Sequence, residues 1–280
     1  MRTLVHLSDL HFGRVDPALL QPLIERIEGI APDLVVVSGD LTQRARSAQF
    51  RQARAFLDAL PAPRLVVPGN HDVPMHNLFA RFFQPLRKYR RYITDELEPF
   101  VADDEIAVLG LNTARSFTIK NGRINAAQLE HVRARLAPLP DSLTKIVVTH
   151  HPLDLPLQQD RHDLVGRAPL AMAMFARCGV DMLLAGHLHV GQTGDTTARY
   201  ASAGHAALVV HAGTATSTRG RGQANSFNVI RIERSSIDVE RWEWTPASAT
   251  FVRGVTDCFE WAAGIWKKKT PQTRRTSRTQ

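Results

Sequence analysis

Short apolar runs alternate with amphipathic helical runs along the first two thirds of the chain, and this alternation limits the fold more than any other feature. The runs at 2–7 (RTLVHL) and 33–38 (DLVVVS) are rich in leucine and β-branched residues, which favour strands. Between them, apolar residues recur at the spacing of one helix face: Leu19, Leu23, Ile27 and Ile30. A strand, a helix and a second strand in this order predict a parallel βαβ unit.

The same alternation continues toward residue 186 and then changes character. We expect further strands and helices, the strands at 64–67, 105–111, 144–150 and 181–186 and the helices at 49–60, 125–137 and 169–179. Asn125 is expected to cap the helix that follows it. From about residue 198, strand-like runs succeed one another without helices, at 199–203, 207–212, 226–233 and 236–244. The sequence therefore predicts an α/β domain with mixed sheets, whose last third is mostly antiparallel β.

The length of 280 residues, 44% of them hydrophobic, suits one large domain or two small ones. We assign residues 1–246 to this domain and residues 247–280 to a C-terminal segment, in which a short aromatic stretch precedes a basic tail. Six basic residues and no acid lie in 267–280, so the rest of the chain is almost balanced, with 29 basic and 27 acidic residues. We expect a disordered tail, with contact to an anionic membrane or another polyanion as the alternative. No specific nucleic-acid binding is expected.

The sequence shows neither a signal peptide nor a membrane-spanning run. The first twenty residues lack a basic segment followed by an unbroken apolar one, and no window reaches the roughly 20 apolar residues that span a bilayer. Cys178 and Cys258 are far apart and lack CxxC spacing, so neither a disulfide framework nor a zinc–cysteine site is expected. We therefore expect a cytoplasmic protein, with peripheral membrane association as the alternative. A homodimer is an open alternative to a monomer.

Five of the expected strands end in acidic, histidine or asparagine side chains. The sequences at these ends are SDLH (8–11), SGDL (38–41), PGNHD (68–72), THHP (149–152) and AGHLH (185–189). In open α/β sheets, ligands bind at the carboxyl ends of the strands, so five clusters that are distant in sequence are expected to meet at one site.

The spacing and chemistry of these residues indicate a metal centre. Asp9 and His11 are two residues apart, so in an extended segment their side chains point the same way, and the pair at 187 and 189 repeats this spacing. Glycines adjoin three of the clusters and are expected to let the chain turn tightly: Gly39, Gly69 and Gly186. Imidazole, carboxylate and amide donors without thiolate suit manganese, iron or zinc. Seven candidate ligands are too many for one ion and enough for two.

The blocks DLH, GDL, GNHD, HHP and GHLH, in this order, resemble the signature of the calcineurin-like metallophosphoesterase superfamily. The resemblance spans residues 9–189. The compact domain with GNHD and AGHLHVG looks most like the bacterial class III cyclic nucleotide phosphodiesterase branch. The resemblance implies a four-layer α/β/β/α sandwich of mixed sheets around two divalent metal ions, Mn²⁺, Fe²⁺/Fe³⁺ or Zn²⁺.

The resemblance also implies a role for each matching residue. One ion would be held by Asp9, His11 and His189, and the other by Asn70, His150 and His187. Asp40 would bridge the two. The ligand in the fourth block is the histidine two before proline, so His150 is preferred to His151, which is a candidate for substrate binding. His71 would be the catalytic histidine, and Asp72 its orienting partner.

The chemistry of these residue types agrees with phosphodiester hydrolysis. Two cations about 3.5–4 Å apart can clamp a phosphate while one of them activates water as hydroxide. His71 is suited to donate a proton to the departing alkoxide, because the pKa of histidine lies close to the working pH. We therefore expect a metal-dependent phosphoric diester hydrolase acting on a cyclic nucleotide or a similar small diester.

Three other functions compete with this one. The chain is also similar to UDP-diacylglucosamine hydrolases, which act on lipid-related substrates, but their best-known branch has arginine where His71 stands. HLSDLHFG (6–13) resembles the opening block of the family's double-strand-break nucleases, yet the chain is too short for their capping domain. A non-catalytic scaffold would lack metal ligands, and none is missing.

Histidines outside the expected ligand set are mostly assigned to the structure. His6, inside the first strand, is expected to be buried and hydrogen-bonded. For His151, His205 and His211, a structural role competes with a substrate-facing one. His131 and His162 are expected at the surface.

Two stretches rich in aromatic and basic residues have alternative interpretations. In 79–92, apolar residues fall on one helical face: Phe79, Phe82, Phe83 and Leu86. That face either packs on the core or forms a substrate wall or membrane-contacting flap. The stretch 257–269 (DCFEWAAGIWKKK) combines aromatic residues and lysines as interfacial helices do, and it could equally dock on its own domain.

Overall fold

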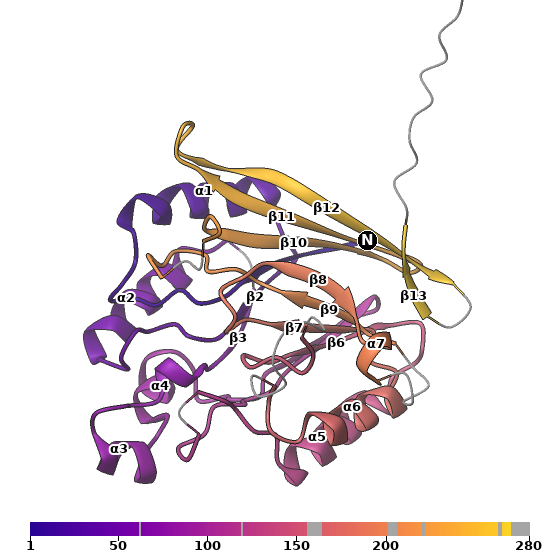
Figure 1. Ribbon diagram of the computed structural model, residues 1–280, viewed down its shortest axis with the longest axis horizontal. Helices are drawn as coiled ribbons and strands as arrows, with labels where there is room; N and C mark the ends of the chain where they lie inside the picture. Colours follow the sequence, from indigo (N-terminus) through magenta and orange to yellow (C-terminus); the bar gives the residue numbers. More distant parts are fainter. Residues whose placement is uncertain are drawn as a thin grey trace, which may run out of the picture.

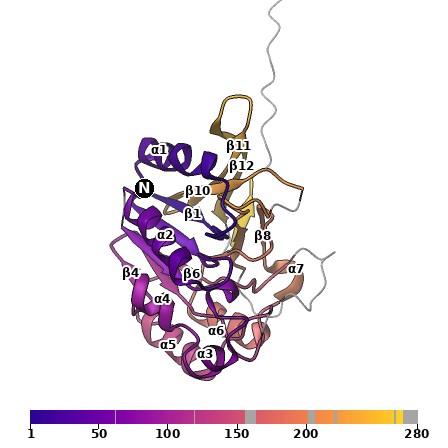
Figure 2. The same cartoon turned by 90° about the vertical axis from the view of Figure 1, so that its left-hand side faces the viewer.

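The computed structural model describes residues 1–61, 63–118, 120–155, 164–200, 206–219, 222–262 and 265–269. Two β-sheets face each other, and helices cover their outer faces (Figures 1 and 2). This is the four-layer α/β/β/α arrangement that the resemblance implied.

The first sheet joins the N-terminal strands to the C-terminal third of the chain. Its seven strands lie in the order β13 (Ile265–Lys268), β12 (Thr250–Ala262), β11 (Ser236–Thr245), β10 (Ser226–Glu233), β1 (Arg2–Leu7), β2 (Leu34–Ser38) and β3 (Arg64–Val67). The β1–β2–β3 part is parallel, and β10 pairs antiparallel with β1. From β10 to β13 every pairing is antiparallel, as expected for strands that follow one another without helices.

The second sheet has a parallel centre and antiparallel edges. Its order is β4 (Phe100–Ala102), β5 (Ile106–Gly110), β6 (Thr144–Val148), β7 (Met182–Ala185), β9 (Leu208–His211) and β8 (Gln192–Asp195). The strands β5, β6, β7 and β9 are parallel, whereas β4 and β8 run opposite to their neighbours.

Three apolar layers hold the sandwich together. The helices α1 (Leu20–Ile30), α2 (Ser47–Asp58) and α4 (Arg87–Tyr92) pack on the outer face of the first sheet. The helices α5 (Ala126–Leu136) and α6 (Ala168–Arg177) cover the second sheet. Between the sheets, Leu4 of β1 meets residues such as Val108 and Val148, whereas its neighbour Val5 faces the helices. Both faces of β1 are buried, which explains its continuous apolar sequence.

Four shorter helices complete the described structure: the 3₁₀ helices η1 (Pro17–Leu19) and η2 (Asn70–Asp72), and the α-helices α3 (Leu78–Phe83) and α7 (Thr197–Tyr200). As predicted, Asn125 caps α5, because its side chain accepts a hydrogen bond of 2.9 Å from the backbone N–H of Gln128. Within the described residues, no helix is long and apolar enough to cross a bilayer.

The structure departs from the sequence prediction in the C-terminal third. Arg199 and Tyr200 end the short helix α7 instead of starting a strand, and residues 201–205 lie outside the described residues. The first sheet does not stop at residue 246, because β12 and β13 extend it to Lys268. Phe259 and Trp266 of these strands are buried between the sheets, so the aromatic stretch is a pair of strands rather than an interfacial helix.

Candidate metal centre

All seven expected metal ligands gather where strands of the two sheets end. Asp9 and His11 follow β1, Asp40 follows β2, and Asn70 opens η2 after β3. His150 follows β6, and the pair at 187 and 189 follows β7. Six of the seven side chains are buried, and Asn70 is partly exposed. The expected convergence at the carboxyl ends of the strands is therefore present.

The first cluster consists of Asp9, His11 and His189. The Oδ1 atom of Asp9 lies 3.3 Å from Nε2 of His189 and 3.5 Å from Nε2 of His11. The two Nε2 atoms are 3.3 Å apart. Oδ1 of Asp9 is buried and has no hydrogen-bond partner among the described residues. Bonds from a metal ion to nitrogen or oxygen are about 2.0–2.2 Å long, so two donors on one ion stand about 3–3.5 Å apart. The cluster fits an ion.

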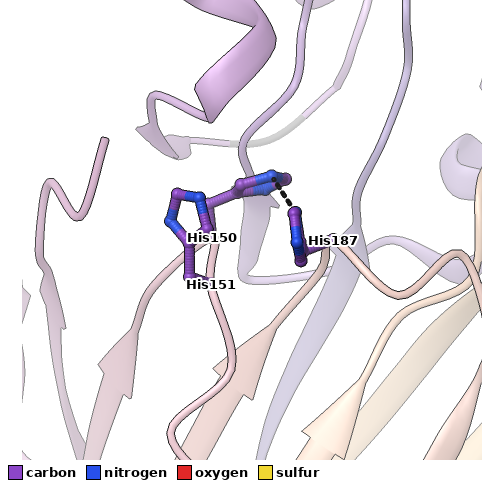
Figure 3. Close-up of side chains that lie close together, drawn as sticks. All are labelled: His150, His151 and His187. Atoms are coloured by element: carbon purple, nitrogen blue, oxygen red, sulfur yellow. Dashed lines mark hydrogen bonds between the residues drawn. The ribbon is translucent and has the colours of Figure 1, made fainter. Parts of the chain in front are cut away.

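The second cluster consists of Asn70, His150 and His187. The Nε2 atom of His150 lies 3.1 Å from Oδ1 of Asn70 and 3.3 Å from Nδ1 of His187, and Figure 3 shows the latter contact. Oδ2 of Asp40 is 3.4 Å from Nε2 of His150 and 3.7 Å from Nε2 of His11. Asp40 therefore stands between the clusters, in the position of a bridging ligand.

Outer hydrogen bonds turn two of the imidazoles so that their lone pairs face the site. Nδ1 of His150 donates to the carbonyl of Ser38 at 2.8 Å, and Nδ1 of His189 donates to the carbonyl of Arg219 at 3.2 Å. Because a carbonyl only accepts, the proton of each neutral ring is on Nδ1, and Nε2 is left free to bind a metal ion.

The charges of the site favour bound cations. Burial alone would raise the pKa of Asp40, but His150 and other histidines outweigh it and hold this pKa well below the ordinary value. Burial likewise lowers the pKa of His150, yet Asp40 and Asp9 raise it to about 9. Burial and His150 lower the pKa of His187 to about 3. The ionised carboxylates and the neutral His187 have the ligand form that metal ions require, whereas His150 is charged at neutral pH in the absence of an ion and must lose its Nε2 proton to bind one.

Five of the ligands have a backbone conformation that the sequence analysis did not predict. The expectation was an extended segment, but Asp9, His11, Asp40, His187 and His189 all have positive φ, between 51° and 70°. Asp and His tolerate this left-handed region better than most residues. Backbone strain of this kind persists where the surrounding structure fixes it, and it clusters at functional sites. The two members of each pair converge through left-handed turns rather than through a strand's alternation.

The glycines beside the ligands serve two different purposes. Gly39 has a φ of +90°, so it provides the tight turn that was expected. Gly69 has an ordinary φ of −105°, but a Cβ atom there would collide with Oδ1 of Asp40. A Cβ atom at Gly186 would collide with the hydroxyl of Ser8. These two positions require glycine because other groups approach closely.

His71 stands beside the first cluster, with its ring fixed at both nitrogens. Nδ1 donates to the carbonyl of Gln43 at 2.9 Å, and Nε2 accepts from Nη1 of Arg219 at 3.1 Å. Its ring centroid lies 4.9 Å from that of His11. Burial is the main reason why the pKa of His71 is lowered. Arg219 follows β9 in a segment without a recognised motif, so its contact with His71 was not predictable from the sequence.

Asp72 has a different position from the one expected. The Nδ1 proton of His71 goes to the Gln43 carbonyl, and the Asp72 carboxylate instead accepts from the backbone N–H groups of Leu41, Thr42 and Gly69 at 2.9–3.1 Å. Burial and the Asp40 carboxylate raise the pKa of Asp72 to about 6. Asp72 thus ties the loop that carries Asp40 to the loop that carries Asn70 and His71.

His151 is buried next to the second cluster (Figure 3). Its Nδ1 atom is 2.8 Å from the hydroxyl of Thr113, and its ring centroid lies 4.9 Å from that of His187. Burial and His150 hold its pKa well below the ordinary value. Its use in substrate binding remains a prediction.

The remaining histidines are placed as follows. His6 is buried, with Nε2 2.9 Å from the Ser38 hydroxyl, as expected. His211 is also buried and accepts from Gln192 at 2.9 Å. His131 is partly exposed. His162 and His205 lie outside the described residues.

Comparison with known proteins identifies the family and agrees with the fold. The family model of the calcineurin-like phosphoesterases matches residues 2–191, so the chain belongs to this family. It is 28% identical, over 172 residues, to the 3',5'-cyclic adenosine monophosphate phosphodiesterase CpdA of Escherichia coli, and the match covers 58% of each chain. A cAMP/cGMP dual specificity phosphodiesterase of Mycobacterium tuberculosis is 27% identical over 260 residues, covering 82% of this chain and 75% of that protein.

A solved structure shows the same fold. The purple acid phosphatase PPD1 from yellow lupin superposes with a TM-score of 0.65 at 12% identity, covering 91% of this chain and 53% of that one. The chain thus spans a little over half the length of the E. coli relative and of this structural neighbour.

Proposed function

We propose that this protein is a dinuclear metal-dependent phosphodiesterase that hydrolyses a small phosphodiester, with a cyclic nucleotide as the leading candidate. The observation that supports the proposal is the pair of donor clusters with Asp40 between them, in which Oδ1 of Asp9 is buried without a hydrogen-bond partner among the described residues. Manganese, iron and zinc are the ions that suit these donors. When bound, two such ions supply positive charge and Lewis acidity for attack on a phosphoester.

The chain itself supplies substrate binding and proton transfer. The guanidinium of Arg219 lies 3.1 Å from Nε2 of His71, so a cation and a titratable group stand together at the edge of the clusters. Arg219 is suited to bind a phosphate oxygen. His71 can give a proton from Nε2 to the leaving alkoxide in its charged form, in which the Gln43 carbonyl still accepts from Nδ1 and Arg219 has turned from Nε2 to a phosphate oxygen. Its lowered pKa makes the charged ring a stronger acid.

The names of the two curated relatives support the substrate class, since both act on cyclic nucleotides. To test the proposal, the purified chain is stripped with a chelator, reloaded separately with Mn²⁺, Fe²⁺ or Zn²⁺, and assayed with bis-p-nitrophenyl phosphate. We expect hydrolysis only after reloading, and Asp40→Asn should abolish it. A chain that binds two ions yet hydrolyses no diester with any of the three metals would contradict the proposal.

A second candidate is a hydrolase of lipid-related phosphoesters or pyrophosphates at a membrane surface. The observation that favours it is the exposure of Phe79, Phe82 and Phe83 on α3, which starts six residues after Asp72. A panel of cyclic AMP, cyclic GMP, glycerophosphodiesters and UDP-diacylglucosamine separates the two candidates. We expect the highest kcat/KM for a cyclic nucleotide, and a clear preference for UDP-diacylglucosamine would reverse the order.

A further inference from the structure

Five large apolar side chains are exposed on α3 and on the loop beside it. They are Leu78, Phe79, Phe82, Phe83 and Phe117, which we call the phenylalanine patch. Phe83 is 72% exposed and Phe117 is 88% exposed. The rings touch in pairs, with centroids 4.9 Å apart for Phe79 and Phe83 and 5.2 Å apart for Phe82 and Phe117. A contiguous exposed apolar surface of this kind marks an interaction site.

This finding decides between the two interpretations of the stretch 79–92. If the apolar stripe packed on the core, its phenylalanines would be buried. Instead Leu86 and Tyr89, at the start of α4, are the buried members, and the three phenylalanines of α3 face outward. Packing on the core therefore accounts only for the α4 end of the stretch.

A buried arginine joins the segments that carry the phenylalanine patch. The guanidinium of Arg81, which is only 4% exposed, donates to the carbonyls of Pro74, Ser116 and Thr118 at 2.7–3.2 Å. These bonds fix the loop of Phe117 and the segment after η2 to α3. The exposure of the rings is thus built into a fixed local structure.

A cationic pocket adjoins the patch, between α3 and α4. It has a volume of about 320 Å³, and its lining includes Arg87, Lys88 and Arg91. Their partners are neutral: Arg87 donates to the side chain of Gln84, Lys88 donates to the carbonyl of Ala45, and Arg91 lies over the ring of Tyr92. Within the described residues, none of the three cations forms a salt bridge with a carboxylate. The pocket therefore carries uncompensated positive charge.

We propose that the phenylalanine patch and the cationic pocket together bind the surface of an anionic phospholipid bilayer. The phenyl rings enter the interface between headgroups and acyl chains, and the pocket takes a lipid phosphate. Exposed aromatic residues beside basic ones are the combination by which peripheral proteins bind such surfaces. A second copy of the chain fits less well, because a symmetric dimer through this face would bring two positively charged pockets together.

The basic C-terminal tail beyond residue 269 lies outside the described residues. Figure 1 places α3 and α4 away from β13, the last described strand. The phenylalanine patch is close to the metal centre along the chain, since only residues 73–77 connect η2 to α3. The inference holds whichever diester the site hydrolyses, so it goes beyond the proposed function.

The experiment is co-sedimentation of the full chain with vesicles of 30% phosphatidylglycerol and 70% phosphatidylcholine, and with vesicles of phosphatidylcholine alone. We expect binding to the anionic vesicles that weakens with salt. The double variant Phe79→Ser/Phe83→Ser should lower the partition coefficient about tenfold or more, because two rings no longer leave water. Arg87→Gln/Arg91→Gln should remove most of the preference for anionic vesicles.

Two matched controls separate this surface from others. Leu170→Ser removes a similarly exposed apolar residue of α6 and should leave binding unchanged. Arg274→Gln/Arg275→Gln/Arg278→Gln, in the full chain, reduces the charge of the tail and should lower binding less than the Phe79/Phe83 variant does. Hydrolysis of bis-p-nitrophenyl phosphate by every variant verifies the fold.

A second measurement locates the rings themselves. Brominated phosphatidylcholine should quench the emission of a tryptophan introduced by Phe83→Trp, relative to the unchanged chain, and should not quench the one introduced by Leu170→Trp. Equal vesicle binding by the Phe79/Phe83 variant and the unchanged chain would overturn the proposal. So would a dimer, seen by sedimentation velocity, that this variant dissociates, because a second copy would then cover the patch.

Discussion

At the scale of single residues, the sequence predicted the identity of the donors better than the way the chain presents them. Strand ends, spacing and donor chemistry led to side chains that do converge, because parallel strands end at a common edge. Their left-handed backbone, the collision that makes Gly69 necessary and the contact of Arg219 with His71 depend on neighbours distant in the sequence. Local pattern carries no information about such contacts.

His71 should be separable from metal binding. We expect His71→Ala to retain most of the bound metal and to lower turnover about 10²–10⁴-fold, because Asp9, Asp40 and the other donors remain while proton transfer is lost. Elemental analysis of the reloaded protein and kinetics with bis-p-nitrophenyl phosphate measure the two effects. His131→Ala, a change at a partly exposed helix residue, is the control. Loss of both metals in His71→Ala would show that this side chain is a ligand.

Gly69 tests how tightly the bridging carboxylate is positioned. In Gly69→Ala the new methyl group would collide with Oδ1 and the backbone nitrogen of Asp40, although φ at this position suits alanine. Because Asp40 serves both clusters, we expect the metal content to fall for both ions together. Gly194→Ala, where nothing lies within 4 Å of the added atom, should retain both. Full metal content in Gly69→Ala would mean that the loop yields without moving the carboxylate.

At the scale of elements, the regular strands and helices of the α/β part were predictable, since each has its own periodicity and length. The C-terminal stretch was harder because its apolar residues fit either an amphipathic helix or a strand with one buried face. The difference is decided by pairing: β12 joins β11 over most of its length, and β13 then adds to β12. Pairing partners are a property of the folded chain and are not visible in a short sequence window.

Trp266 should contribute strongly to stability if β13 is part of the core. Its ring is buried between the sheets, and its Nε1 donates to Asp181 at 3.1 Å. We expect Trp266→Ala to lower the free energy of unfolding by about 3–5 kcal/mol, as replacements of buried aromatic residues do. Urea denaturation measures this change. Val255→Ala, at an exposed residue of β12, should cost far less. Equal effects of the two changes would place β13 outside the core.

At the scale of the whole molecule, the sandwich brings the C-terminal third of the chain against the loop after β1, which carries the first metal ligands. The segment after β9 returns to the first loop, where Thr214 donates to the carbonyl of Asp9 at 2.8 Å and Thr216 donates to that of Leu10 at 2.9 Å. The layer order could be inferred from the resemblance. The strand order of the first sheet, in which β1 separates β2 from β10, could not be inferred from composition or periodicity.

Burial of histidines in this sandwich makes its stability depend on pH. Burial lowers the pKa of His211 from 6.5 to about 4. Below pH 6.5, His211 therefore becomes protonated in the unfolded chain, whereas in the folded protein it stays neutral until the pH approaches 4. As the pH falls from 6.5 toward 4, this difference lowers the free energy of unfolding by about 1.4 kcal/mol per pH unit. Above pH 6.5 the stabilising contribution of neutral His211 is fully present.

The variant His211→Gln isolates this effect from other titrating groups. Glutamine can still bond to Gln192 but does not titrate, so between pH 7 and pH 5 the variant should lose about 2 kcal/mol less stability than the unchanged protein. Urea denaturation of both proteins at the two pH values, under identical metal conditions, gives the difference directly. If the two proteins lose the same stability, the pKa of His211 in the folded protein is ordinary, and burial does not lower it. The sign of the difference between the two proteins is decisive. If the fold stabilised the charged form of His211, the unchanged protein would gain stability relative to the variant as the pH falls.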